Sequence, residues 1–100
     1  MHIDNLGEFE ELVHDIKCPL LIFLVNRWNR IDLKQFDIYK KYINIIDINI
    51  DNAPSVLTKH RLRNTPCMVL YNDGIYQLGA HYITNCAVRA WAYNYGVGNE

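Results

Sequence analysis

The stretch LLIFLVNRWNRID, residues 20–32, decides the framework of this chain. Its first six residues, Leu20–Val25, are all apolar, which is typical of a strand in a sheet covered on both faces. Asp32 is a good helix cap, and Gln35 three residues later completes a capping box. We therefore expect a buried strand, a polar loop over residues 26–31, and a helix that begins after Asp32.

The rest of the chain alternates between helix and strand patterns in the order α-β-α-β-α-β-β-α. The pair Asp73-Gly74 after Asn72 is a strong hairpin signal. Residues 1–3 are compatible with a strand stub. The predicted elements are a helix with its apolar stripe at Leu6, Phe9, Leu12, Val13 and Ile16 and its cap at Asp4 or Asn5, a strand at 46–50, a short helix at 54–60, strands at 68–71 and 75–78, and a last helix opened by Thr84.

Length and composition predict one small globular domain. At 100 residues the chain can form a single core, and we expect a domain over 1–95 with a flexible tail at 96–100. The formal net charge of −1 gives no overall attraction to nucleic acid or membrane. The sequence shows no signal peptide and no apolar run long enough to span a bilayer, so we expect a cytoplasmic protein without a membrane partner.

The cysteines and histidines do not form a recognisable site. Cys18, Cys67 and Cys86 are widely spaced and include no Cys-x-x-Cys pair, which argues against a disulfide scaffold and against a zinc knuckle. The histidines lack metal-ligand spacing. The chain also lacks a glycine-rich phosphate loop. We predict neither a metal nor a cofactor.

Several segments, taken in order, resemble the thioredoxin family. The resemblance implies an α/β thioredoxin-like fold, with a central mixed sheet of about four strands and helices on both faces. It also implies a cis peptide bond at Thr65-Pro66 that faces the loop after Trp28, and a short helix after that loop. The segments that carry it are Phe23–Trp28, Asn49–Pro54, Lys59–Pro66, Asn72–Gly74 and Leu78–Ala80.

The chain departs from this family where the family's chemistry resides. The family has Cys-Gly-Pro-Cys directly after the tryptophan, and this chain has Asn29–Asp32. By the same resemblance, the buried acid that tunes the dithiol aligns with Phe23, and its lysine neighbour aligns with Asp47. Disulfide exchange requires a thiolate attacker and a second thiol that resolves the mixed disulfide. We therefore expect no dithiol oxidoreductase activity.

Cys67 offers an alternative activity. It follows Pro66 directly, and Arg30, Arg63 or the N-terminus of the second helix, which Asp32 caps, could lower its pKa, which would give a single-cysteine thiol oxidoreductase or a peroxidase-like enzyme. Free cysteine is also among the most buried residue types, and we favour a buried Cys67 at the start of a strand. Cys18 and Cys86 are interpreted as core or edge fillers.

Four arginines form the strongest positive signal. In a thioredoxin-like fold, Arg27 and Arg30 lie beside the loop, while Arg61 and Arg63 lead into Pro66 on the facing segment. With Lys59 and His60 they predict one basic rim around the family's substrate groove, with Arg30 turned toward the Arg61–Arg63 side. The alternative is a set of solvated charges paired with Asp32, Asp37 or Asp51. Asp47 has two interpretations as well, a proton-handling acid on a covered face or, as we prefer, a paired structural acid.

The sequence predicts a redox-inactive binding and adaptor module. The resemblance places the partner, a protein or peptide with an acidic stretch, beside the cis proline, where the family pairs extended peptides. Dispersed aromatic residues disfavour nucleic acid as a partner, and the tyrosines leave a homodimer open. The predicted binding residues are Trp28, Asn29, Arg30, Asp32, Arg61, Arg63, Asn64, Thr65 and Pro66.

Overall fold

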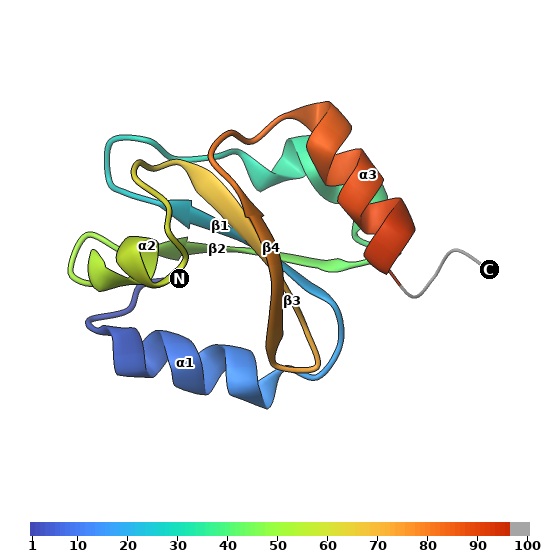
Figure 1. The fold of residues 1–100 in the computed structure, drawn as a ribbon. Helices are drawn as coiled ribbons and strands as arrows, with labels where there is room; N and C mark the ends of the chain where they lie inside the picture. Colours follow the sequence, from blue (N-terminus) through green and yellow to red (C-terminus); the bar gives the residue numbers. More distant parts are fainter. Residues whose placement is uncertain (97–100) are drawn as a thin grey trace.

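Four strands form one mixed sheet in the order β2-β1-β3-β4 (Figure 1). The computed structural model describes residues 1–96, so the predicted tail lies outside the described residues except for Gly96. The α/β fold with a mixed four-stranded sheet and helices on both faces is confirmed. The elements are α1 (Leu6–Asp15), β1 (Leu20–Val25), the 3₁₀ helix η1 (Leu33–Tyr39), β2 (Asn44–Asn49), α2 (Ser55–Lys59), β3 (Cys67–Asn72), β4 (Ile75–Ala80) and α3 (Asn85–Tyr95).

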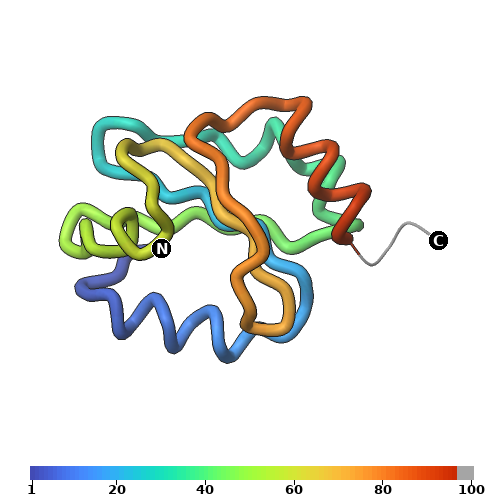
Figure 2. The backbone as a smooth tube through the Cα atoms, viewed as in Figure 1, coloured from blue at the N-terminus to red at the C-terminus, as the bar shows by residue number. Residues whose placement is uncertain are grey.

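Strand β1 is the centre of the sheet. All six of its residues are buried, as the continuous apolar run predicts. It pairs in parallel with β2 and antiparallel with β3. Two core layers result, because successive side chains of a strand point to opposite faces. One layer packs against α1 and α2, and the other packs against η1 and α3. Figure 2 shows α1 and α3 on opposite sides of the sheet.

The helix after the loop is a 3₁₀ helix, which corrects the predicted α-helix and capping box. The Asp32 carboxylate accepts a hydrogen bond from the Lys34 N–H at 3.0 Å, so the cap is present but closes a tighter turn. A 3₁₀ helix has three residues per turn, which places Leu33, Phe36 and Tyr39 on one side. Phe36 and Tyr39 are buried there against the sheet. The apolar spacing of three suits this geometry, and the helix is short, as expected.

Local turn chemistry agrees with the sequence elsewhere. Asp73 and Gly74 both have positive φ, 55° and 77°, which is the conformation that a two-residue hairpin turn requires. Asn5 caps α1, and Thr84 caps α3 through its side chain. The N-terminal stub is present as a parallel bridge between His2 and Asn49. Within the described part of the chain, no helix has both the length and the apolar character needed to cross a membrane.

Candidate functional site

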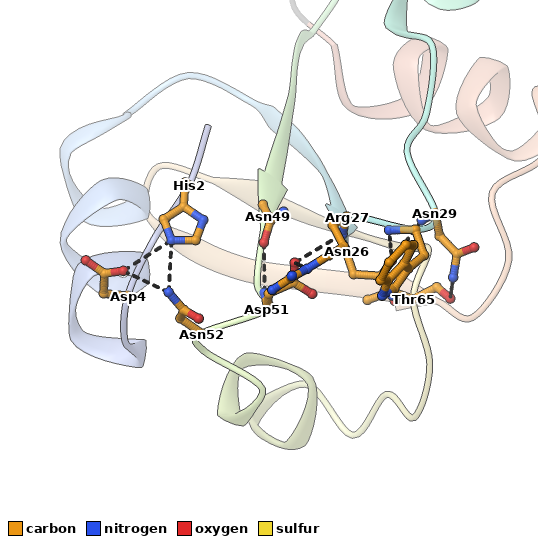
Figure 3. Close-up of polar contacts among 10 residues, drawn as sticks. His2, Asp4, Asn26, Arg27, Asn29, Asn49, Asp51, Asn52 and Thr65 are labelled. Atoms are coloured by element: carbon orange, nitrogen blue, oxygen red, sulfur yellow. Dashed lines mark hydrogen bonds and ion pairs between the residues drawn. The ribbon is translucent and has the colours of Figure 1, made fainter.

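One asparagine shapes the loop that follows β1. The side-chain oxygen of Asn26 accepts hydrogen bonds from the backbone N–H groups of Trp28, at 2.7 Å, and Asn29, at 2.8 Å. This is the local side chain to backbone pattern by which asparagine favours turns. The loop is thus held by its own first residue. Figure 3 shows Asn26 between the loop and the segment that contains Thr65.

Two hydrogen bonds join this loop to the segment before Pro66. Asn26 Nδ2 donates to Thr65 Oγ1 at 2.6 Å, and Asn29 Nδ2 donates to the Thr65 carbonyl at 3.2 Å (Figure 3). The Thr65-Pro66 peptide bond is cis. The loop and the cis-proline segment therefore face each other, as the resemblance implies. We call the surface between them, formed by residues 26–30 and 63–66, the groove.

Trp28 projects from this groove into solvent. Its side chain is 82% exposed, and the Arg27 guanidinium lies 6.0 Å from the centre of its ring. The Arg27 Nε atom is 3.3 Å from Asp51 Oδ2, and the Arg27 N–H donates to the same oxygen. Desolvation acts to raise the pKa of Asp51, but the hydrogen bonds from the Arg27 backbone and side chain outweigh it and lower that pKa. Arg27 is therefore a paired structural charge, as the alternative interpretation of the arginines had it.

The predicted single basic rim is wrong, because Arg30 lines one cavity and Arg61 and Arg63 line another. Arg30 lines a cavity of about 460 Å³ together with His2, Asn26 and Asp47, on the β2 side of the loop. On the other side, a cavity of about 440 Å³ contains Arg61 and Arg63. We call this second cavity the arginine pocket; its lining residues are Arg61, Arg63, Asn64, His81 and Tyr82.

His60 and Lys59 do not extend a rim either. His60 is buried, its Nε2 atom lies 2.6 Å from the Tyr71 hydroxyl, and its Nδ1 atom lies 2.7 Å from the Val56 carbonyl. Burial lowers the pKa of His60, which makes it a neutral core residue. Lys59 Nζ lies 3.5 Å from Glu10 Oε1 on α1. Both residues lie on the α1–α2 side of the sheet, His60 as a buried core residue and Lys59 as an exposed residue paired with Glu10.

Asp47 is paired and half-exposed, which agrees with the preferred interpretation of a paired structural acid and not with an acid on a covered face. Its carboxylate lies 3.8 Å from the N-terminal amine of Met1. The sheet order makes β2 an outer strand, flanked only by the stub at His2 within the described residues. A carboxylate at this edge keeps contact with water. Asp47 is also opposite Phe23 in the register, so neither family position here supplies a buried acid–lysine pair.

The cysteines occupy three separate environments. Cys67 is fully buried at the start of β3, as favoured, and burial raises its pKa to about 11. Cys18 and Cys86 are exposed, which corrects the core alternative in their interpretation as core or edge fillers. The Cys18 sulfur accepts a hydrogen bond from Asn44 Nδ2 at 2.7 Å. Cys67, which follows the groove residue Pro66 directly, is therefore buried and poorly available as a thiolate.

The structure adds three residues to the predicted site. Asn26 is the link between loop and cis-proline segment, and its tendency to form turns was the sequence signal for it. His81 and Tyr82 join Arg61 and Arg63 in the arginine pocket. They follow β4 and reach the pocket only through the fold, so no local pattern marks them. Asp32, in contrast, is occupied in capping η1.

Comparisons with known proteins place the fold. No family profile matches the chain, and no curated protein sequence matches it significantly. Solved thioredoxins do match in structure. Thioredoxin from Fasciola hepatica has a TM-score of 0.74 at 14% identity, over 94% of this chain and 97% of that chain. The reduced Schistosoma mansoni thioredoxin pre-protein has 0.74 at 12% identity, over 94% and 95%.

A third solved structure, Plasmodium falciparum thioredoxin, has a TM-score of 0.68 at 17% identity, over 95% of this chain and 98% of that chain. These matches cover nearly the whole length of both partners. The chain therefore has a thioredoxin-like fold, which its residues had implied. At such low identities the likeness extends to the fold and not to the activity.

Proposed function

We propose that this chain is a redox-inactive binding module that holds a protein or peptide partner in the groove. The proposal rests on the contacts of Asn29 and Asp32, which stand where the family has its two cysteines. Asn29 donates to the Thr65 carbonyl, and Asp32 caps η1. Both side chains are built into the scaffold of the loop, so the loop is a stable surface with a new role in place of a dithiol.

The exposed groups beside this scaffold suit recognition. Trp28 is a large, rigid side chain held at the edge of the groove, and tryptophan is enriched among residues that dominate binding energy. The side chains of Arg30, Arg61 and Arg63 have no hydrogen bond or ion pair with any described residue. Unpaired guanidinium groups favour a partner with carboxylate or phosphate groups. We therefore propose an acidic segment as the partner, bound in the cytoplasm, where unpaired thiols stay reduced.

The Thr65 backbone is only partly available for pairing with an extended peptide. In the family, the backbone beside the cis proline adds a peptide as an extra strand. Here the Asn29 amide already uses the Thr65 carbonyl, which leaves that oxygen one further acceptor site. We propose that side-chain anchors, with Trp28 first among them, supply more of the affinity than backbone pairing does.

Thiol chemistry at Cys67 is the function that the geometry supports least. A nucleophilic cysteine must be accessible and must exist as a thiolate. Cys67 has no exposed surface and a pKa raised to about 11. At neutral pH, roughly one molecule in ten thousand would carry the thiolate.

The redox half of the proposal is tested by insulin reduction. With dithiothreitol as electron source, we expect the wild-type protein to leave the rate of insulin precipitation at its background value, while an active thioredoxin raises it. Cys67→Ser is expected to behave as the wild type does. A rate above background that Cys67→Ser abolishes would overturn the proposal in favour of a single-cysteine enzyme.

The binding half is tested by selecting peptides from a random library displayed on phage. We expect enriched peptides to be acidic and to lose at least tenfold in affinity for Trp28→Ala. Ile75→Ala is the matched control, since Ile75 is a large exposed apolar residue at the hairpin, away from the groove. Equal losses in both variants, or none in Trp28→Ala, would contradict the groove assignment.

A further inference from the structure

We infer that the arginine pocket binds a phosphate monoester carried by a side chain of the bound peptide. This inference rests on the proposed function and names the chemistry of its ligand. The pocket lies between two loops, the segment that leads into Pro66 and the segment between β4 and α3. These loops meet at the same end of the sheet as the loop after β1 (Figure 2).

The charge of the pocket is uncompensated. The Arg61 and Arg63 side chains make no hydrogen bond or ion pair with any residue in the range 1–96, and the lining contains no carboxylate. Some other basic side chains are paired: Arg27 with Asp51, Lys40 with Asp37 and Lys59 with Glu10. Two neighbouring guanidinium groups repel each other, and an anion placed between them removes that repulsion.

The donors in the pocket exceed what one carboxylate can use. Each guanidinium carries five N–H donors, and the Asn64 amide, the His81 ring and the Tyr82 hydroxyl add further donors. A phosphate monoester offers three terminal oxygens and a charge near −2, and it forms bidentate contacts with arginine. The cavity volume of about 440 Å³ also exceeds one carboxylate and leaves space for the phosphorylated side chain.

Arg61 occupies a backbone conformation that ordinarily selects glycine. Its φ is 58°, directly after the end of α2. The Leu62 N–H donates to the Leu57 carbonyl at 2.9 Å and the Arg61 N–H donates to the Thr58 carbonyl at 3.1 Å, which is the Schellman helix ending. An arginine here is less stable than a glycine, so the sequence keeps a guanidinium in the pocket at the expense of stability.

The pocket is continuous with the groove. Arg63 and Asn64 line it, and Thr65 follows directly with its hydrogen bonds to the loop after β1. A peptide held beside Thr65 would thus present a neighbouring side chain to Arg61 and Arg63. This placement favours a phosphorylated peptide over a free nucleotide, which would need no groove.

The inference is tested by titrating ¹⁵N-labelled protein and following the backbone amides of residues 61, 63, 64 and 81. The probes are N-acetyl-O-phosphoserine N-methylamide, the matching glutamate derivative, AMP and inorganic phosphate. We expect the phosphoserine probe to bind in the millimolar range and at least fivefold more tightly than the glutamate probe. Arg61→Gly should weaken its binding at least fivefold.

Two features keep this test decisive. Arg61→Gly removes the guanidinium while it relaxes the backbone, so we expect the variant to stay folded while it loses binding. Arg89→Gln makes the same change of charge on α3, outside the pocket lining, and should leave the phosphoserine affinity unchanged. Equal binding of the glutamate and phosphoserine probes, equal losses in both variants, tighter binding of AMP, or binding of inorganic phosphate alone would each overturn the inference.

The outcomes also separate this inference from the proposed function. If selected peptides need Trp28 but bind Arg61→Gly as well as the wild type, and the phosphoserine probe does not bind, the groove assignment holds and the phosphate assignment falls. If the phosphoserine probe binds through Arg61 but no peptide depends on Trp28, the pocket is real and the groove assignment is wrong.

Discussion

Asn26 and Thr65, which are 39 positions apart in the chain, are joined by a 2.6 Å hydrogen bond from the asparagine amide to the threonine hydroxyl. The oxygen of the same amide accepts hydrogen bonds from the N–H groups of Trp28 and Asn29. One side chain therefore shapes the loop and ties it to the cis-proline segment. This double use fixes the groove without any thiol.

We expect Asn26→Ala to lower the free energy of unfolding by about 1–3 kcal/mol. It leaves the Trp28 N–H and the Thr65 hydroxyl without their partner and leaves the Asn29 N–H with only its 3.3 Å hydrogen bond to the Asn26 carbonyl. Asn26→Asp keeps an acceptor for those N–H groups and an acceptor for the Thr65 hydroxyl, so its loss should stay below about 1 kcal/mol. Urea denaturation followed by tryptophan fluorescence measures both. An alanine variant as stable as the wild type would show that the loop is held by other contacts.

The fold was readable from the sequence because its determinants are local. The apolar run Leu20–Val25, the hairpin pair Asp73-Gly74 and the caps at Asn5 and Thr84 each act within a few residues, and each appears in the structure as predicted. The type of η1 was missed because a spacing of three fits both helix types when the segment is short.

The site was only partly readable, because the directions of exposed side chains depend on contacts across the fold. The sequence places Arg30 beside the loop but does not say on which side of it the guanidinium lies, and it lies on the β2 side. Likewise His60 follows a basic residue in a polar stretch, yet the fold buries it against Tyr71. His81 joins the arginine pocket through a loop that no pattern connects with Arg61.

We expect two thiols to react in the native protein and a third only after unfolding. Cys18 and Cys86 are exposed, whereas Cys67 is buried and its pKa is raised to about 11. A chromogenic disulfide reagent should therefore titrate two equivalents in buffer and three in denaturant. Cys67→Ala should give two equivalents in both conditions. Three fast equivalents in the native wild type would mean that β3 opens readily at its first residue.

His60 should make the protein less stable as the pH falls below neutral. Burial lowers its pKa from the ordinary value of 6.5, the Val56 carbonyl opposes this, and the charge of Lys59 adds to it. Below pH 6.5 the unfolded chain binds a proton at this site and the folded chain does not. Stability contributed by neutral His60 is thus fully present above pH 6.5 and is lost as the pH falls toward the folded pKa, by up to about 1.4 kcal/mol per pH unit.

The difference between wild type and His60→Gln isolates this effect, because His2, His14 and His81 are exposed and are present in both proteins. We expect the free energy of unfolding of the variant, measured by urea denaturation at pH 7.5 and pH 5.5, to fall less than that of the wild type. Parallel pH profiles for the two proteins would show that His60 takes up a proton in the folded state.

Arg61→Gly should stabilise the protein, although it removes a side chain from the candidate site. Arg61 has a φ of 58°, where an L-residue is strained and glycine is not, so we expect a gain of about 0.5–1 kcal/mol in the free energy of unfolding. Arg63 has no positive φ, and Arg63→Gly should lower stability by a similar amount because it adds freedom to the unfolded chain. On this account, urea denaturation should show a higher free energy of unfolding for Arg61→Gly and a lower one for Arg63→Gly. If both variants are destabilised equally, the Arg61 side chain contributes contacts that outweigh its backbone strain, and the argument that arginine is kept there at the expense of stability fails.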